Sequence, residues 1–290
     1  MAGVRAWVAG ARPRTLPAAV SPVLVGSGAA AAADGFELAP ALLALVVAVS
    51  LQVGANYAND YSDGVRGTDA GRVGPLRLVG SGVATPTAVR TAAVVTLGIG
   101  AVAGIGLASI SSWWLVAVGA VALAAAWTYT GGPSPYGYRA LGEVAVFVFF
   151  GLVAVLGTTY AQLDTVTAVS VAGAIGIGAL ACAILVANNL RDIPTDAASG
   201  KRTLAVVLGD RPTRALYVTL VAVATGSLIW LAYLAPQSLL GAVFLLPAAR
   251  GVDAVVRGAS GRALVTVLHD AGLAELVYAV GVTAGLVLHG

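Results

Sequence analysis

Charge is scarce in this chain. Only 10% of its 290 residues are Asp, Glu, Lys or Arg, whereas a soluble globular domain carries about 25%. The rest is largely apolar (59%), with 37 glycines and a mean hydropathy of +0.91. So little charge excludes an ordinary soluble domain and predicts an integral membrane protein, in which small residues let helices pack closely.

Cysteine and histidine are nearly absent as well. The chain has one cysteine, Cys182, and two histidines, which excludes a disulfide framework and gives too few ligands for a zinc site. Cys182 lies in an apolar run, so we expect it to be a buried packing residue. The basic residues lie mostly in loops without a nucleic-acid-binding pattern. We therefore expect no nucleic-acid partner, and no obligate protein partner is predicted.

Long apolar runs make up most of the sequence, and each should cross roughly 30 Å of hydrocarbon. We predict nine spans, at residues 15–33, 40–58, 87–108, 113–130, 142–160, 166–187, 213–233, 237–256 and 267–288. The first is longer than the apolar core of a signal peptide, so we interpret it as a retained span. The sequence predicts one membrane domain over residues 1–290, an all-α bundle of nine transmembrane helices.

The basic residues fall on one side of this arrangement. All 16 Lys and Arg residues lie in the N-terminal segment or in and beside the loops that follow even-numbered spans. The opposite loops, such as 34–37 and 109–112, hold none. The positive-inside rule then places the N-terminus in the cytoplasm of a multi-pass protein of the cell membrane.

Two groups of Asp and Asn residues stand at the cytoplasmic ends of the second and sixth spans. They are Asn56, Asn59, Asp60, Asp63 and Asp69, and Asn188, Asn189, Asp192 and Asp196. In each group an Asn precedes an Asp by four residues, which hints at a duplicated four-helix unit with parallel pseudo-symmetry. Residues four apart share a helix face, so both groups should point into one cavity, although Pro194 is expected to distort or end its helix.

Carboxylates at a membrane edge are costly unless a cation compensates them. One Asp at a helix end is often just a solvated cap, but two matching groups on one face would repel each other. Carboxylate and amide oxygens suit hard divalent cations, and Mg²⁺ completes its octahedron with water and substrate phosphates. The two groups therefore predict a Mg²⁺ site on the cytoplasmic side.

Basic residues accompany both Asp groups. They are Arg66, Arg72, Arg77, Arg191, Lys201 and Arg202. Topology alone would explain them, but carboxylate, Mg²⁺ and basic side chains together suit a diphosphate, and we expect Lys201 and Arg191 to bind it. A diphosphate site that opens into a lipid-facing bundle implies a substrate with an isoprenoid tail, whose allylic cation needs apolar and aromatic walls.

At these residues the chain resembles the UbiA superfamily of intramembrane aromatic prenyltransferases. The resemblance covers the whole chain, and its principal stretches are NDYSD at 59–63 with Asp69, NNLRD at 188–192 with Asp196 and Lys201, RPRTLP at 12–17, GPLR at 74–77 and LGE at 141–143. The GPLR stretch and the six-residue interval from Asp63 to Asp69 are similar to the menaquinone branch. Glu143 departs from the pattern, because the family usually has Asp there.

The resemblance implies a nine-helix bundle with a cytoplasmic cap, a lateral opening to lipid and Mg²⁺ as cofactor. The candidate catalytic residues are Asp60, Asp63, Asp192 and Asp196. The candidate metal ligands are Asn59, Asp63, Asp69, Asp192 and Asp196. The candidate substrate-binding residues are Arg14, Asn56, Arg66, Arg77, Arg139, Glu143, Asn188, Asn189, Arg191 and Lys201. Either Arg77 or Arg139 would hold the carboxylate of the acceptor.

The implied reaction transfers a polyprenyl group from an allylic polyprenyl diphosphate to 1,4-dihydroxy-2-naphthoate, with decarboxylation, to give demethylmenaquinone. Gly131, Gly132 and Gly137 are expected to leave room for this two-ring acceptor, while 4-hydroxybenzoate and homogentisate stay open as alternatives. A cation-coupled transporter is a more distant alternative, but it would place its Asp residues near the membrane midplane. A CDP-alcohol phosphatidyltransferase would need Asp-Gly-x-x-Ala-Arg, which the residues after Asp63 do not supply.

Overall fold

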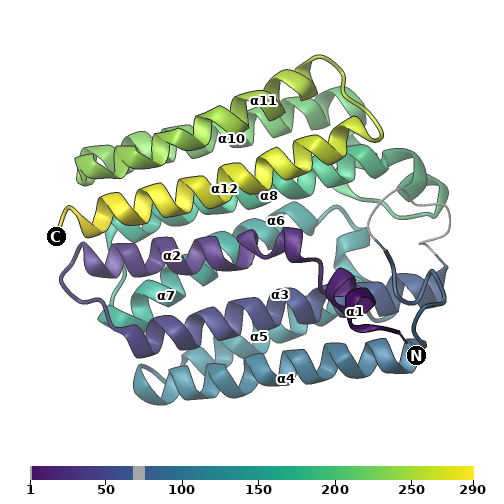
Figure 1. Ribbon diagram of the computed structural model, residues 1–290, viewed down its shortest axis with the longest axis horizontal. Helices are drawn as coiled ribbons and strands as arrows, with labels where there is room; N and C mark the ends of the chain where they lie inside the picture. Colours follow the sequence, from purple (N-terminus) through teal and green to yellow (C-terminus); the bar gives the residue numbers. More distant parts are fainter. Residues whose placement is uncertain (1, 68–75) are drawn as a thin grey trace.

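The structure is a computed structural model that describes residues 2–67 and 76–290. Within these two ranges the regular elements are all helices, and the one β-bridge joins Arg139 to Arg202. Figure 1 shows long helices lying roughly parallel, with α10 and α11 along one edge of the bundle and α4 along the opposite edge. The predicted all-α class is confirmed.

Every predicted span coincides with a helical segment. These segments are α2 (Pro17–Ala31), α3 (Leu38–Arg66), α4 (Pro86–Ile110), α5 (Leu115–Thr128), α6 (Gly142–Val146) continued by a π-helix (Phe147–Val153) and α7 (Ala154–Leu163), α8 (Ala168–Ala198), α10 (Asp210–Leu234), a 3-10 segment (Pro236–Phe244) continued by α11 (Leu245–Val256), and α12 (Ala263–Val287). In the described part of the chain, seven of them are long and apolar enough to cross a membrane, whereas α2 and α5 are shorter. The chain is a multi-pass membrane protein.

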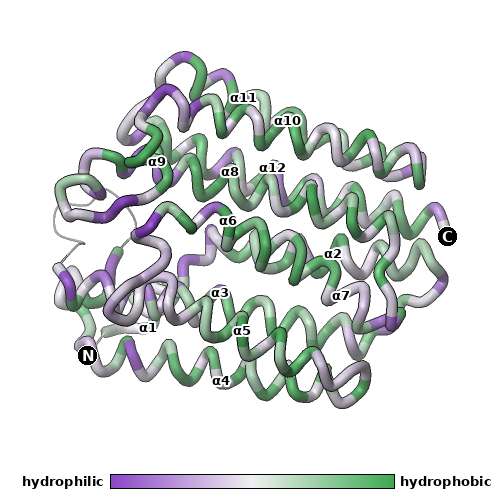
Figure 2. Tube along the Cα trace, turned by 180° about the vertical axis from the view of Figure 1, so that it is seen from behind, coloured by the Kyte–Doolittle hydropathy of each residue, from purple (hydrophilic) through white to green (hydrophobic). Residues whose placement is uncertain are grey.

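Short helices complete the fold. α1 (Val4–Ala11) precedes a 3-10 turn (Pro13–Thr15), a second 3-10 turn (Tyr136–Tyr138) lies between α5 and α6, and α9 (Leu204–Leu208) follows α8. Polar residues are concentrated at the end of the bundle that also holds the N-terminus, α1 and α9, and the C-terminus lies at the opposite end (Figure 2). The bundle therefore has one polar end.

α8 is the central helix. In its most apolar 18-residue window 72% of the residues are buried, a larger share than in the other candidate spans. Glycine allows this close packing: a β-carbon on Gly176 would lie 2.2 Å from the Tyr278 hydroxyl of α12. A β-carbon on Gly178 would lie 2.9 Å from the Phe147 ring. The helix that carries the second Asp group is thus held on several sides.

Both Asp-bearing helices extend beyond their predicted spans. α3 reaches Arg66 and is followed by Gly67 at φ +74°, and α8 reaches Ala198 and is followed two residues later by Gly200 at φ +75°. Side chains are strained at such angles, so glycine suits these helix ends. The Asp groups consequently lie in the last turns of regular helices, where residues four apart share a face.

Pro194 was expected to distort or end its helix, and the second alternative is wrong, because α8 continues through Pro194 to Ala198. The proline removes one backbone donor, and it lies on the exposed side of the last turns. The hydroxyl of the next residue, Thr195, donates to the Asp192 carbonyl at 3.0 Å and adds a local bond there. Asp192 and Asp196 therefore remain on one continuous helix.

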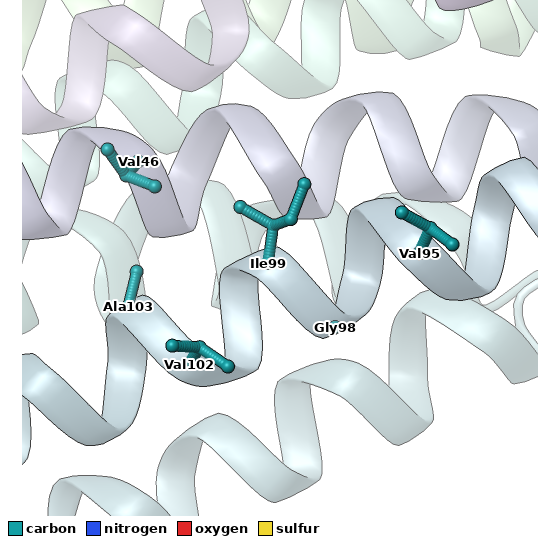
Figure 3. A pocket seen from close by; sticks show the side chains of 6 residues that line it. All are labelled: Val46, Val95, Gly98, Ile99, Val102 and Ala103. Atoms are coloured by element: carbon teal, nitrogen blue, oxygen red, sulfur yellow. The ribbon is translucent and has the colours of Figure 1, made fainter.

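An apolar groove of about 590 Å³ lies on α3 and α4 (Figure 3), and no residue of either Asp group lines it. Its lining residues are Val46, Val95, Gly98, Ile99, Val102 and Ala103. Both helices are candidate membrane spans, and none of these six side chains is polar. The groove therefore suits hydrocarbon and is not the candidate site.

Candidate active site

The first Asp group presents two carboxylates with different surroundings. Asp63 is buried, and Oδ1 of its carboxylate accepts a hydrogen bond from the Tyr138 hydroxyl at 2.7 Å. Asp60 is fully buried, and its two oxygens accept the backbone N–H groups of Leu78 (2.8 Å) and Val79 (3.0 Å). Asp60 thus fastens the chain that precedes α4, whereas Asp63 faces the loop between α5 and α6.

The two Asn residues of this group also have defined partners. Oδ1 of Asn59 accepts from the Thr130 hydroxyl at 2.7 Å, which ties α3 to the end of α5. Nδ2 of Asn56 donates to the Ala11 carbonyl and the Thr15 hydroxyl, each at 3.0 Å. Asn56 therefore holds the connection between α1 and α2, and Asn59 lies closer to Asp63.

In the second group, basic side chains bind the carboxylates. Nε and Nη2 of Arg191 each lie 2.7 Å from one oxygen of Asp192, and Nη2 also donates to Oδ1 of Asn188 at 2.8 Å. The Lys201 ammonium lies 3.8 Å from Oδ1 of Asp196. Asp192, Asp196 and Lys201 are all buried, so positive charge compensates carboxylates that have little contact with water.

Asn189 connects the second group to α6. Its amide donates to Oε1 of Glu143 at 2.9 Å, and both side chains are buried. The Cys182 thiol donates to the Glu143 carbonyl at 3.1 Å. Cys182 is buried and free, as predicted, and with Asn189 it holds the first turn of α6 against α8.

The loop between α5 and α6 joins the two Asp groups. The backbone N–H of Arg202 donates to the Tyr138 carbonyl at 3.2 Å, and the Ala140 N–H donates to the Arg202 carbonyl at 2.9 Å. The Arg66 guanidinium, at the end of α3, donates to the carbonyls of Thr130 and Gly132 in the same region. The loop is therefore bonded to the end of α3 and to the segment that follows α8.

Tyr136 and Tyr138 point to different sides of this loop. The Tyr136 hydroxyl donates to the Ala125 carbonyl of α5 at 2.9 Å, and burial raises the pKa of Tyr136 to about 12, so it stays a neutral donor. The Tyr138 ring centroid lies 5.3 Å from the Lys201 ammonium and 5.6 Å from the Arg66 guanidinium carbon. Sequence reasoning missed Tyr138, although its place in a polar loop beside Arg139 was a signal.

The loop glycines do not provide the space that was expected. A β-carbon on Gly131 would lie 2.5 Å from the Trp127 carbonyl oxygen, and one on Gly137 would lie 2.6 Å from the Tyr129 carbonyl oxygen. The expectation was wrong for both residues, because they let the loop fold tightly onto the end of α5. Gly132 has open space around it and a φ of +78°, as a turn requires.

The remaining candidates lie at the edge of the site or outside the described residues. Arg14 and Arg139 are exposed, and Arg77 is half-buried next to the Leu78 that Asp60 holds. Asp69 falls within the undescribed segment 68–75, as do Arg72 and the first two residues of the GPLR stretch. These residues stay predictions.

The carboxylate oxygens of the two Asp groups are suitable ligands for Mg²⁺. Tyr138 lies between the two groups, because its hydroxyl binds Asp63 and its ring lies 5.3 Å from the Lys201 ammonium, which in turn lies 3.8 Å from Asp196. Within residues 2–67 and 76–290, no three acidic, His or Cys side chains form a ready-made metal cluster. Three buried carboxylates are nevertheless the hard oxygen ligands that Mg²⁺ takes when water and phosphate complete its coordination.

Comparisons with known proteins find similar sequences over most of the chain. The model of the UbiA prenyltransferase family matches residues 19–268. A 1,4-dihydroxy-2-naphthoate octaprenyltransferase of Mycobacterium tuberculosis is 57% identical over 287 residues, which cover 99% of this chain and 98% of that protein. The Escherichia coli protein of the same name is 39% identical, covering 84% of this chain and 82% of its own length.

Solved structures share the fold. A UbiA homolog from Aeropyrum pernix superposes with a TM-score of 0.70 and 18% identity, covering 93% of this chain and 97% of its own. A UbiA homolog from Archaeoglobus fulgidus, bound to GPP and Mg²⁺, superposes with a TM-score of 0.65 and 15% identity, covering 97% and 99%. The arrangement of helices is therefore one that other proteins adopt at low sequence identity.

Proposed function

The chain belongs to the UbiA prenyltransferase family, and we propose that it transfers a polyprenyl group from a polyprenyl diphosphate to 1,4-dihydroxy-2-naphthoate. One observation supports this function above all. Buried Asp residues of α3 and α8 lie at one end of a membrane bundle, together with the basic residues Arg66, Arg191 and Lys201. The acceptor is supported by the relatives that bear its name and match nearly the whole chain.

The buried carboxylates have separate roles in this proposal. Asp63, Asp192 and Asp196 would hold Mg²⁺, with Asn59 and Asp69 in support, and Mg²⁺ would neutralise charge on the departing diphosphate. The divalent cation is supported by the Mg²⁺ named with the Archaeoglobus homolog. Asp60 contributes by fixing the backbone at Leu78 and Val79.

Basic residues bind the leaving group and help it depart. Lys201 and Arg191 provide positive charge on the α8 side of the site, and Arg66 provides it on the α3 side. As the allylic C–O bond breaks, its electron pair stays on the diphosphate, and fixed positive charges stabilise that product. The remaining allylic cation needs surroundings without water.

The acceptor reacts through its ring. The ring carbon that bears the carboxylate attacks the allylic carbon from which the diphosphate has left. A C–C bond forms there, and the carboxylate leaves as CO₂. The electron pair of the broken C–C bond restores the aromatic ring, so the product is demethylmenaquinone at the quinol level. Arg77 or Arg139 would bind the carboxylate before it leaves, and Asn56, Asn188, Asn189, Glu143 and Arg14 complete the proposed substrate-binding set.

We further propose that the chain forms one domain with nine spans, in which α2 and α5 cross the membrane with the seven longer segments. The N-terminus, both Asp groups and a cap made of the connecting segments would face the cytoplasm of the cell membrane. The one-sided distribution of the 16 basic residues supports this orientation. The gathering of polar residues at one end of the bundle supports it too (Figure 2).

The test is an acceptor screen with purified protein in detergent and a radiolabelled polyprenyl diphosphate. We expect Mg²⁺-dependent release of diphosphate and a labelled naphthoquinol when 1,4-dihydroxy-2-naphthoate is supplied. Product from 4-hydroxybenzoate or homogentisate instead would keep the family chemistry and change the acceptor. Failure to release diphosphate with any of the three acceptors would contradict prenyl transfer itself.

A further inference from the structure

Tyr138 contacts groups from both halves of the site. Its hydroxyl donates to the Asp63 carboxylate of α3 at 2.7 Å, while its carbonyl accepts from the Arg202 N–H beyond α8 at 3.2 Å. Its ring centroid lies 5.3 Å from the Lys201 ammonium on one half of the site and 5.6 Å from the Arg66 guanidinium carbon on the other. One side chain of the α5–α6 loop therefore links Asp63 to one cation at the end of α3 and to another just after α8.

We propose that Tyr138 is a positioning residue with two separable actions: its hydroxyl orients Asp63 for metal binding, and its ring holds Lys201 and Arg66 around one diphosphate. This inference rests on the proposed function, because it assigns Tyr138 a role in the same reaction. Tyr138 acts through its three neighbours and takes no part in bond breaking.

The hydroxyl acts on the carboxylate. A donor 2.7 Å from Oδ1 fixes the rotation of the Asp63 carboxylate about its last side-chain bond. A ligand already held in one orientation loses less freedom when it binds a metal, and removing such a partner typically weakens metal binding by about 10–100-fold. Loss of the hydroxyl alone should therefore raise the metal concentration that the site needs.

The ring acts on the two cations. Lys201 and Arg66 come from opposite halves of the chain, and like charges that converge on one site repel each other. An aromatic ring within about 6 Å attracts each of them through its quadrupole. A phenylalanine would keep this effect, whereas a leucine, which has no aromatic ring, would remove it, so diphosphate binding should distinguish the two substitutions.

The experiment uses Tyr138→Phe, Tyr138→Leu and Tyr136→Phe. Tyr136 is the matched control, because it belongs to the same 3-10 turn but its hydroxyl binds the Ala125 carbonyl instead of an Asp. The full chain in detergent is titrated with Mn²⁺ at fixed inorganic diphosphate, and with inorganic diphosphate at fixed Mn²⁺. The readout is the rise in melting temperature, which needs no turnover.

We expect Tyr138→Phe to raise the Mn²⁺ concentration for half-maximal stabilisation about tenfold, and to titrate normally with diphosphate once Mn²⁺ is saturating. Tyr138→Leu should weaken both titrations, and its KM for polyprenyl diphosphate should rise while the KM for the acceptor stays unchanged. Tyr136→Phe should match the unmodified protein in both titrations. If Tyr138→Leu does not fold, the two phenylalanine variants still decide the role of the hydroxyl.

Two results would overturn the role of Tyr138 alone. One is a Mn²⁺ titration of Tyr138→Phe that matches the unmodified protein, and the other is an equal shift in Tyr136→Phe, which would indicate general loosening of the loop. If Mn²⁺ and diphosphate together fail to stabilise even the unmodified protein, the proposed diphosphate site itself is wrong, and the Tyr138 inference fails with it.

Discussion

The guanidinium of Arg191 binds both oxygens of the Asp192 carboxylate, with two N–O distances of 2.7 Å. Both side chains are about 95% buried, at 5% and 4% exposure. A side-chain cation therefore compensates a carboxylate that we assign to Mg²⁺. For the metal to bind Asp192, Arg191 must share the carboxylate or turn away from it, and its guanidinium is then available for diphosphate oxygens.

Replacing Arg191 by Gln should separate these two roles. The variant leaves Asp192 buried without its cation, which typically costs roughly 3–5 kcal/mol, so its melting temperature without metal should fall. Mg²⁺ should restore more of that stability than it adds to the unmodified protein, while turnover drops about tenfold or more because a diphosphate ligand is lost. Arg257→Gln is the control, since that exposed pair with Asp253 lies elsewhere. Turnover of Arg191→Gln at the unmodified rate would contradict the assignment.

Alanine at Asp63, Asp192 or Asp196 should lower turnover about a hundredfold or more while the protein still folds in detergent. Asp60→Ala should behave differently. It leaves the N–H groups of Leu78 and Val79 without an acceptor, so it should lower the free energy of unfolding by about 1–3 kcal/mol. Melting curves and initial rates distinguish the two kinds of loss, and near-normal turnover in two of the three ligand variants would contradict a site with two Asp groups.

Lys201→Met should weaken polyprenyl diphosphate binding more than acceptor binding. The buried ammonium, 3.8 Å from Asp196, is assigned to phosphate oxygens, and losing one charged hydrogen bond corresponds to roughly a tenfold rise in KM. Arg202→Met provides a neighbouring control, because that side chain is exposed. A change confined to the KM of the acceptor would show that Lys201 binds the other substrate.

Much of the fold could be predicted because membrane helices correspond to long apolar runs in the sequence. The Asp and Asn groups were readable for a related reason: in a chain with 13 acidic residues, clustered carboxylates stand out against an apolar background. Helix ends were less readable. Nothing in the apolar pattern shows that α3 continues past residue 58 to Arg66, since its last turns are polar and are held by side-chain bonds.

The contacts between the two halves of the site could not be predicted, because they depend on a loop. Tyr138 meets Asp63 only after the α5–α6 loop folds back on α5 and bonds to Arg202. Periodicity carries no information about such a path. The same reason explains the error at Gly131 and Gly137, which looked like open space in the sequence and instead allow the loop to approach α5 closely.

Membrane orientation can be tested with single cysteines in a Cys182→Ser background. Serine retains a donor for the Glu143 carbonyl. A cysteine replacing Ser199, which is exposed after α8, should react with an impermeant maleimide only from the cytoplasmic side. A cysteine replacing Ser109, exposed at the other end of α4, should react only from outside. Labelling of both from one side would contradict the proposed span count and orientation.

Acceptor choice is the last prediction. We expect 1,4-dihydroxy-2-naphthoate to be prenylated with release of CO₂, and 4-hydroxybenzoate to react at least about a hundredfold more slowly, because a misplaced nucleophile loses rate steeply. If the site binds a two-ring acceptor, as we propose, the smaller acid would be held loosely, and its reacting carbon would not be fixed beside the prenyl group.

The measurement compares kcat/KM for the two acids under saturating polyprenyl diphosphate, with labelled carboxylate carbon to follow CO₂. Arg77→Met and Arg139→Met in parallel identify the residue that binds the carboxylate, since that variant should raise the KM of the acceptor and leave that of the diphosphate unchanged. Arg262→Met, an exposed residue before α12, is the control. Equal kcat/KM for the two acids would show that the site does not select by ring size, and the chain would then act on a broader class of aromatic acids.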